Sequence, residues 1–298
     1  MVESNTTSAD FTAAPPRINE WQRFIRVFFQ RRIVIFGLFI LVMLGFTALF
    51  ADWLAPYNPY KQNLTNILQQ PSKEHLLGTD SVGRDTLSRL IYGTRTALTV
   101  GFVSAGIAAS IGITLGILAG YFGGIINMII MRLTDVLMPF PMIVLALLLT
   151  AVLGGGIHNV ILALGIAMVP GYIRVMCGMT LSIKENDYVL AERAMGASHL
   201  RIMARHVLPN AFAPIIVVIT LQLGFLILSE AALSFLGIGI KPPGAAWGAM
   251  VNEGYRFLVR IPILSFAPGA AIMLVVFAFN MVGDALRDAL DPRLRGTL

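Results

Sequence analysis

Long apolar runs alternate with polar segments along this chain from residue 33 onward. A helix of about 20 apolar residues crosses the hydrocarbon core of a membrane, and several runs reach that length. A backbone inside a membrane must satisfy its own hydrogen bonds, so each run is expected to be helical. The pattern predicts an all-α integral membrane protein with six transmembrane helices, at about 33–54, 97–121, 127–153, 157–178, 211–236 and 264–286.

The same pattern assigns the chain to one membrane domain, because no polar stretch is long enough for a second, soluble domain. An even number of spans puts both termini on the same side of the membrane. With the N-terminus inside, inner segments carry twelve Lys and Arg residues and outer segments carry eight, which favours cytoplasmic termini. The predicted parts are a cytoplasmic N-terminal tail at 1–32, a membrane domain at 33–286 with outer loops at 55–96 and 237–263 and a cytoplasmic loop at 179–210, and a cytoplasmic C-terminal tail at 287–298.

The N-terminal tail has two parts of different character. Residues 1–16 are rich in Ser, Thr, Ala and Pro, which predicts disorder. Trp21, Phe24 and Phe28 then recur at helical spacing between arginines, which predicts a helix lying in the membrane surface in contact with lipid. A simple cytosolic extension of the first span is the alternative. Without a small-residue cleavage pattern, the first apolar run is expected to be an uncleaved span.

Two spans carry features beyond hydrophobicity. Pro139 and Pro141 interrupt the third span, where proline breaks helical hydrogen bonding and predicts a kink. Small residues in the second span recur mostly every four positions, which lets helices approach closely in lipid and predicts a span packed inside a bundle. The alternative is the general frequency of glycine in membrane helices. These small residues are Gly101, Ala105, Ala109, Gly112, Gly116 and Gly120.

Composition sharpens this picture. Among the 298 residues, 56% are hydrophobic and only 13% are charged, with a net charge of +6. The basic residues lie beside the spans rather than in a stripe, so no nucleic-acid partner is expected. Cys177 is the single cysteine, which excludes a disulfide framework within the chain and a cysteine-based metal cluster.

Motifs for catalysis are missing from the sequence. The four histidines form no His-Glu-x-x-His metal motif, and there is no Gly-x-Ser-x-Gly elbow, so we expect no catalytic residue, no metal site and no enzymatic activity in this chain. A phosphate-binding loop needs Gly-Lys-Ser/Thr, and none of the four lysines follows a glycine. The chain is therefore expected to bind no cofactor.

A polar segment at 184–210 lies between the fourth and fifth spans and is too hydrophilic to sit inside the membrane. Asn186 or Asp187 can cap a first short helix, and Gly196 can take the left-handed turn that ends it. Ser198 can cap a second short helix that runs to His206. Two short helices held by spans at both ends predict a rigid cytoplasmic knob.

The composition of this knob suits a docking surface for a soluble partner. Ala191 and Ala194 keep one face of the first helix small, so that the groove of a partner can close over it. The alternative is an ordinary amphipathic loop between spans. The spacing Ala-x4-Gly-x11-Leu-Pro in this segment resembles the EAA loop of ABC-importer permeases, with Ala191, Gly196, Leu208 and Pro209 at its fixed positions. The usual Glu-Ala-Ala would fall on residues 190–192, where only the middle residue matches.

Five further motifs, in order along the chain, are similar to the C-type permease of dipeptide/oligopeptide/nickel importers. Together they cover most of the sequence from about residue 20 onward. They are HLLGTDSVGRDTLSRLIYGTR at 75–95, GILAGYFGG at 116–124, MRLTDVLMPFP at 131–141, SEAALSFLGIGIKPPGAAWGAM at 229–250 and FNMVGDALRDALDPRLRG at 279–296.

The resemblance implies a six-span type I ABC-importer permease of the cell inner membrane. Its partners would be a second homologous permease, two ATP-binding subunits that hold the ATP and Mg²⁺, an extracytoplasmic solute-binding protein and a peptide substrate. Other cargoes, namely a nickel complex, glutathione or a cationic peptide, are alternatives, as is a motor-free channel or secondary carrier. The residues expected to couple the pore to the ATPase are Ala191, Glu192, Ala194, Gly196, Ala197, His206, Leu208 and Pro209.

Charged residues outside the knob give two further sets of candidates. Asp135 and Glu230 lie within spans, where a charge is costly, and are expected to contact the peptide or the second permease. A structural hydrogen bond or ion pair is the alternative for both. In the outer loop, charges of alternating sign are expected either to touch the binding protein or the incoming peptide, or to form a salt-bridged scaffold. These are Asp80, Arg84, Asp85 and Arg89.

Overall fold

The computed structural model describes residues 20–290, and the expectations for 1–19 and 291–298 lie outside that range. All regular elements in the described part are helical, as predicted. They are α1 (Glu20–Phe28), α2 (Arg32–Leu49), α3 (Ala51–Leu54), a 3₁₀ turn (Leu64–Asn66), α4 (Thr86–Phe122), α5 (Gly124–Leu137), α6 (Met142–Leu153), α7 (Ile157–Lys184), α8 (Asp187–Ala194), α9 (His199–Ile202), a π-helical turn (Met203–Val207), α10 (Leu208–Phe235), α11 (Trp247–Tyr255) and α12 (Ile263–Leu290).

Within residues 20–290, five helices are long and apolar enough to cross a membrane, namely α2, α4, α7, α10 and α12. The third predicted span is instead divided into α5 and α6, which meet at an angle of 88° and make a sixth crossing if counted together. Pro139 and Pro141 explain the break, because proline lacks an amide hydrogen and disfavours helix at the preceding residue. The predicted kink is therefore a complete interruption of the helix.

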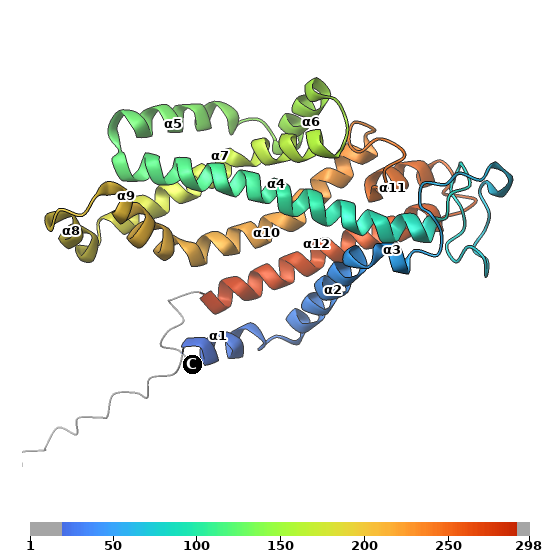
Figure 1. Cartoon of the computed structure of the whole chain (residues 1–298), viewed down its shortest axis with the longest axis horizontal. Coiled ribbons are helices and arrows are strands. Elements are labelled where there is room, and N and C mark those ends of the chain that lie inside the picture. The colour runs from blue at the N-terminus through green and yellow to red at the C-terminus, as the bar shows by residue number, and fades with distance from the viewer. Residues whose placement is uncertain (1–19, 291–298) are drawn as a thin grey trace, which may run out of the picture.

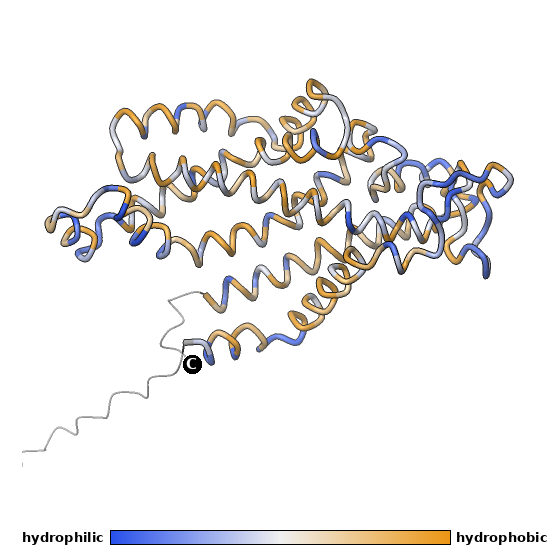
Figure 2. The backbone as a smooth tube through the Cα atoms, viewed as in Figure 1, coloured by the Kyte–Doolittle hydropathy of each residue, from blue (hydrophilic) through white to orange (hydrophobic). Residues whose placement is uncertain are grey.

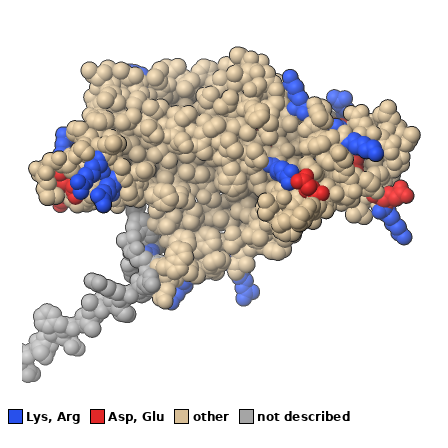
Figure 3. Space-filling view, viewed as in Figure 1, with Lys and Arg blue, Asp and Glu red and all other residues tan. Residues whose placement is uncertain are grey.

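The helices form an elongated bundle with polar segments at its two ends (Figure 1). α8 and α9 lie at one end, and α3, α11 and the loop before α4 lie at the other. Hydrophobic residues fill the middle (Figure 2), and most visible charges lie near the two ends, with a few along the upper and lower edges (Figure 3). This distribution is what a chain needs to place its middle in lipid and its ends in water.

Two predicted loops are shorter than the hydropathy pattern indicates. α4 begins at Thr86, well before the apolar run at 97, because the Asp85 side chain accepts a hydrogen bond from the Ser88 amide at 2.8 Å and caps the helix. The outer segment 237–263 contains α11. Hydropathy marks only the part of a helix that lies in lipid, so both extensions escape it.

The most extensive helix packing joins α4 to α7. Gly112, Gly116 and Gly120 are buried on one face of α4, as the small-residue spacing predicts. A Cβ atom at Gly116 would lie 2.6 Å from the Cβ of Met176, and one at Gly120 would lie 2.7 Å from the Cβ of Thr180. The two backbones approach this closely only because glycine has no side chain.

α1 packs against the end of α12 and is separated from α2 by a turn, so it is not a straight extension of the first span. Val27 and Phe28 are buried against Ala285 and Ala289, whereas the Trp21 side chain is 66% exposed. Part of the aromatic face therefore packs on the protein. The location of α1 at a membrane surface stays a prediction.

We predict that Gly116→Ala lowers the free energy of unfolding by about 1–3 kcal/mol, because the added methyl group overpacks the α4–α7 contact. Gly106→Ala is the matched control. Gly106 lies on the same helix, and a Cβ there would meet nothing within 4 Å. Thermal unfolding of both purified variants in detergent measures the difference. Equal melting temperatures would show that the close approach does not limit stability.

Candidate functional site

The knob, defined here as residues 187–207, begins with α8 and turns sharply at Gly196. This glycine has φ +85°, which confirms the predicted left-handed turn. The Ala197 amide donates to the Glu192 carbonyl and the Gly196 amide donates to the Arg193 carbonyl, each at 3.1 Å. These two bonds form a Schellman motif, which satisfies the carbonyls at the end of α8. At the start of α8, Asn186 occupies the cap position, but its side chain donates to the Ile183 carbonyl instead of capping the helix.

The second half of the knob is continuous with α10 and does not form a separate helix. Ser198 caps α9 as predicted, accepting a hydrogen bond from the Arg201 amide at 3.4 Å. The chain then passes through the π-helical turn into α10 without a corner at Pro209. The Leu208 amide bonds to the Met203 carbonyl, five residues back. This wider turn occurs at the place where Pro209, near the start of α10, has no amide to donate.

Buried apolar residues hold the knob against the ends of α4 and α7. Val189 of α8 lies in one cluster with Met176 of α7, Ile202 of α9, Val207 of the π-helical turn and Ala211 of α10. All five side chains are at least nine-tenths buried. A displacement of α8 must therefore move the neighbouring spans as well, because protein interiors are close-packed.

Polar contacts add to this attachment at the end of α4. The Tyr121 hydroxyl and His199 Nδ1 are 3.0 Å apart and join α4 to α9. The Lys184 ammonium donates to the Gly120 carbonyl at 3.0 Å and joins the last turn of α7 to α4. These contacts were not predicted from the sequence, because each joins residues more than 60 positions apart.

Glu192 and His206, both predicted as coupling residues, meet inside the knob. His206 Nε2 lies 3.6 Å from Glu192 Oε1, and both side chains are partly exposed. The Tyr188 ring lies beside that of His206, with centroids 6.1 Å apart. The pair joins α8 to the π-helical turn, so Glu192 has a partner within the chain.

Several apolar side chains are exposed on the knob although the segment as a whole is polar. The Met195 side chain is 75% exposed and that of Leu200 is 72% exposed. Ala191 and Ala194 are exposed beside Gly196, where a Cβ would meet nothing within 4 Å. Clustered exposed apolar residues with a polar rim mark interaction sites. Of the other predicted coupling residues, Ala197 is half-buried at the turn, and Leu208 and Pro209 are exposed at the start of α10.

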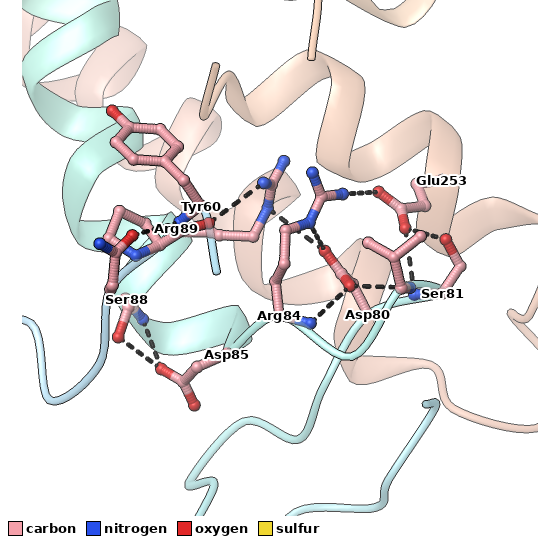
Figure 4. Close-up of polar contacts among 11 residues, drawn as sticks. Tyr60, Asp80, Ser81, Arg84, Asp85, Ser88, Arg89 and Glu253 are labelled. Carbon is pink, nitrogen blue, oxygen red and sulfur yellow. Dashed lines mark hydrogen bonds and ion pairs between the residues drawn. The ribbon is translucent and has the colours of Figure 1, made fainter. Parts of the chain in front are cut away.

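At the opposite end of the bundle, charged side chains form a buried network between the outer loop, α4 and α11 (Figure 4). Asp80 Oδ2 lies 2.6 Å from Arg84 Nε and 3.5 Å from Arg89 Nε. Arg84 Nη2 lies 3.3 Å from Glu253 Oε2 on α11. Glu253 also accepts hydrogen bonds from the backbone amide and hydroxyl of Ser81. The network ties segments about 170 residues apart in the sequence.

Asp85 lies near this network but serves a different contact. Besides capping α4, it accepts a hydrogen bond from the Ser88 hydroxyl at 2.7 Å and lies 2.9 Å from His75 Nδ1. Gly83, with φ +76°, makes the tight turn between the two sets of contacts, and the carbonyl of Asn63 packs where its side chain would be.

The geometry of the outer network favours the scaffold interpretation. Each of the four predicted residues is at most 6% exposed within this chain alone, and each has partners inside it. Contact with a binding protein or a peptide would require accessible side chains. The contact interpretation of these four residues therefore stays a prediction. Sequence reasoning missed Glu253, which completes the network from α11.

The two charged candidates in the spans have different surroundings. Glu230 is 1% exposed and accepts a hydrogen bond from the Ser234 hydroxyl at 2.7 Å. The Ser234 oxygen also accepts from the Ile240 amide, so Glu230 holds the end of α10 to the following loop. Asp135 pairs with Arg174 of α7, and both side chains are 49% exposed. The sequence analysis did not single out Arg174.

Comparisons with known proteins match two parts of the chain to family models. Residues 112–296 match the family described as binding-protein-dependent transport system inner membrane component, and residues 19–71 match the N-terminal TM domain of oligopeptide transport permease C. The chain is 42% identical over 277 residues to the glutathione transport system permease protein GsiD of Escherichia coli and to that of Shigella boydii, covering 93% of this chain and 91% of each relative.

Two solved structures share the fold at low sequence identity. Inward-facing conformations of the MetNI methionine ABC transporter match with a TM-score of 0.53 and 20% identity, covering 68% of this chain and 96% of that one. An amino acid ABC transporter with histidines matches with a TM-score of 0.51 and 16% identity, covering 66% and 92%. At such identities the likeness shows the fold alone.

We predict that Arg84→Gln destabilises the protein by about 3–5 kcal/mol, because it leaves buried carboxylates without their partner. The matched control is Arg256→Gln, which removes an exposed arginine just after α11. Thermal unfolding of the purified variants measures the effect. A melting temperature for Arg84→Gln equal to that of the control would contradict a scaffold role.

Proposed function

The chain belongs to the family of binding-protein-dependent transport system inner membrane components, and we propose that the cargo of this ABC-importer permease subunit is a short peptide. Two similarities support the cargo. One is the match of residues 19–71 to the oligopeptide permease domain, and the other is the 42% identity to permeases of glutathione, itself a tripeptide. A motor-free channel or secondary carrier does not fit this family membership.

The knob is the proposed docking site for the ATP-binding subunits, and the observation that carries this is its exposed apolar side chains. Leu190, Met195 and Leu200 project from a segment that is otherwise polar. The small side chains of Ala191 and Ala194 between them leave room for a groove to close. Because this chain has no phosphate-binding loop, ATP and Mg²⁺ would be held by the partners.

Force applied to the knob has a direct route into the membrane. α9, the π-helical turn and α10 follow one another without a loop, so a push on the knob acts along α10. The buried cluster around Val189 carries the same movement to α4 and α7. In the proposed cycle, ATP binding closes the two motors, the knobs follow, and the pore between two homologous permeases opens outward. Hydrolysis then resets it.

The outer end of the bundle would receive the cargo. A solute-binding protein delivers peptide to the surface made by the outer loop and α11, which the buried network keeps in one shape. In the proposed arrangement the termini lie in the cytoplasm and the subunit lies in the cell inner membrane.

We predict that Ala191→Arg abolishes co-purification of the ATP-binding subunits and keeps the second permease, because a long charged side chain blocks the small face of α8. Ser182→Arg, at an exposed position in the last turns of α7, is the control and keeps both partners. The measurement is the mass of the detergent-purified complex after co-expression with the products of the neighbouring genes. Retention of the ATP-binding subunits by Ala191→Arg would refute docking at this face.

We further predict ATP-dependent uptake of glutathione or trialanine by the whole complex in proteoliposomes with its binding protein. The branch of permeases that this chain resembles also includes nickel importers, so uptake of a nickel complex is measured in parallel. Uptake of the nickel complex without either peptide would overturn the cargo and leave the subunit's place in an importer intact.

A further inference from the structure

A cavity of about 340 Å³ lies where the α5–α6 break faces α7 and α10. Its volume falls within the range of small-molecule sites, which are mostly apolar with a few polar groups. It lies at the break between α5 and α6, which meet at an angle of 88° (Figure 1). Its lining includes Met138, Pro141, Met168, Gly171, Gln222 and Phe225.

The ion pair of Asp135 and Arg174 lies about one helical turn from the lining of this cavity. Met138 lies three residues after Asp135, and Gly171 lies three residues before Arg174, so each cavity residue shares a helix face with one member of the pair. Arg174 lies within the span predicted at 157–178, four residues before its end, and Asp135 lies within the span predicted at 127–153. The pair is thus expected inside the membrane, toward its cytoplasmic side.

Both charged side chains are open on the surface of this chain. Each is 49% exposed, in contrast to Glu230, which is enclosed. Ionisable groups at membrane depth face a bundle interior or a water-filled path, because exposure to lipid is costly. The face of α7 beside the cavity is also open, since a Cβ at Gly171 or Gly178 would meet nothing within 4 Å.

We propose that the Asp135–Arg174 pair is a binding station for the two charged termini of the transported peptide. The peptide carboxylate replaces Asp135 on Arg174, and the peptide ammonium replaces Arg174 on Asp135. This exchange leaves no charge without a partner at any stage, and the neighbouring cavity accepts the peptide's uncharged part. The station rests on the proposed peptide cargo.

The chemistry distinguishes this role from a contact with the second permease. The two residues already neutralise each other, so a subunit docked permanently on them would need no charge there. A zwitterion carries both charges at once and can open the pair without leaving either member unpaired. Gln222, on the opposite wall of the cavity, offers an amide that can bond a peptide group.

The test compares peptides that keep or lose one terminal charge. The whole complex is reconstituted with its binding protein, and the amount of trialanine moved per ATP hydrolysed is measured at equal occupancy of that protein. We expect Arg174→Gln to reduce this ratio about tenfold for free trialanine and to leave it unchanged for trialanine amide, which has no carboxylate to lose. We expect Asp135→Asn to reduce the ratio for free trialanine and to leave it unchanged for N-acetylated trialanine, which has no ammonium group.

Controls separate this inference from the proposed function. Arg132→Gln removes an exposed arginine one turn before Asp135 and is expected to move both peptides like the wild type. Equal losses for free and amidated trialanine, or no loss for either, in Arg174→Gln would assign the pair a structural role and overturn the station. Failure of the wild-type complex to move any peptide would overturn the proposed cargo instead. Asp135→Asn supplies an independent result should Arg174→Gln not fold.

Discussion

The close approach of α4 and α7 is the contact on which the arrangement of this chain depends. Gly112, Gly116 and Gly120 allow it, because any side chain on that face of α4 would strike α7. In lipid, helices gain little from burying apolar surface against one another, so such packing supplies much of the attraction. The result is a rigid pair that extends through the bundle and fixes the position of everything attached to its ends.

Both candidate interaction surfaces are attached to this pair through α4. At one end, the Tyr121 hydroxyl contacts His199 of the knob, and the Gly120 carbonyl accepts a hydrogen bond from Lys184 just before it. At the other, Arg89 joins the buried charge network, and Trp247 of α11 donates a hydrogen bond to the Leu90 carbonyl at 3.0 Å. One helix of 37 residues therefore carries contacts that lie on opposite sides of the apolar region. A movement imposed at the knob can reach the outer surface without crossing a flexible loop.

Hydrophobic periodicity and turn chemistry predicted most of the helices and turns. Contacts between residues far apart in the sequence could not be predicted in this way. Five spans, the turn at Gly196 and the cap at Ser198 follow from local rules, because each is decided within a few residues. The division of the third span follows from Pro139 and Pro141, but proline alone does not give the angle between the two halves. The continuity of the knob with α10 was missed, since Leu-Pro is usually a place where helices begin. Glu253 and Arg174 were missed for another reason: each is defined by a partner that is far away in the sequence.

The surfaces that this chain leaves exposed are the ones to which the proposed interactions are assigned. The α4–α7 contact and the outer network are closed, with their glycines covered and their charges paired within the chain. The exposed apolar side chains of the knob and the half-exposed pair of Asp135 and Arg174 are open, and each open surface has a different chemistry. Exposed apolar and small side chains suit a protein groove that stays attached, because burying them gains free energy without unpairing a charge. A neutral pair beside a cavity suits a visitor that brings two opposite charges and leaves again, because exchange of partners changes little in energy. The same chain thus separates a lasting contact from a passing one by the kind of surface it leaves uncovered.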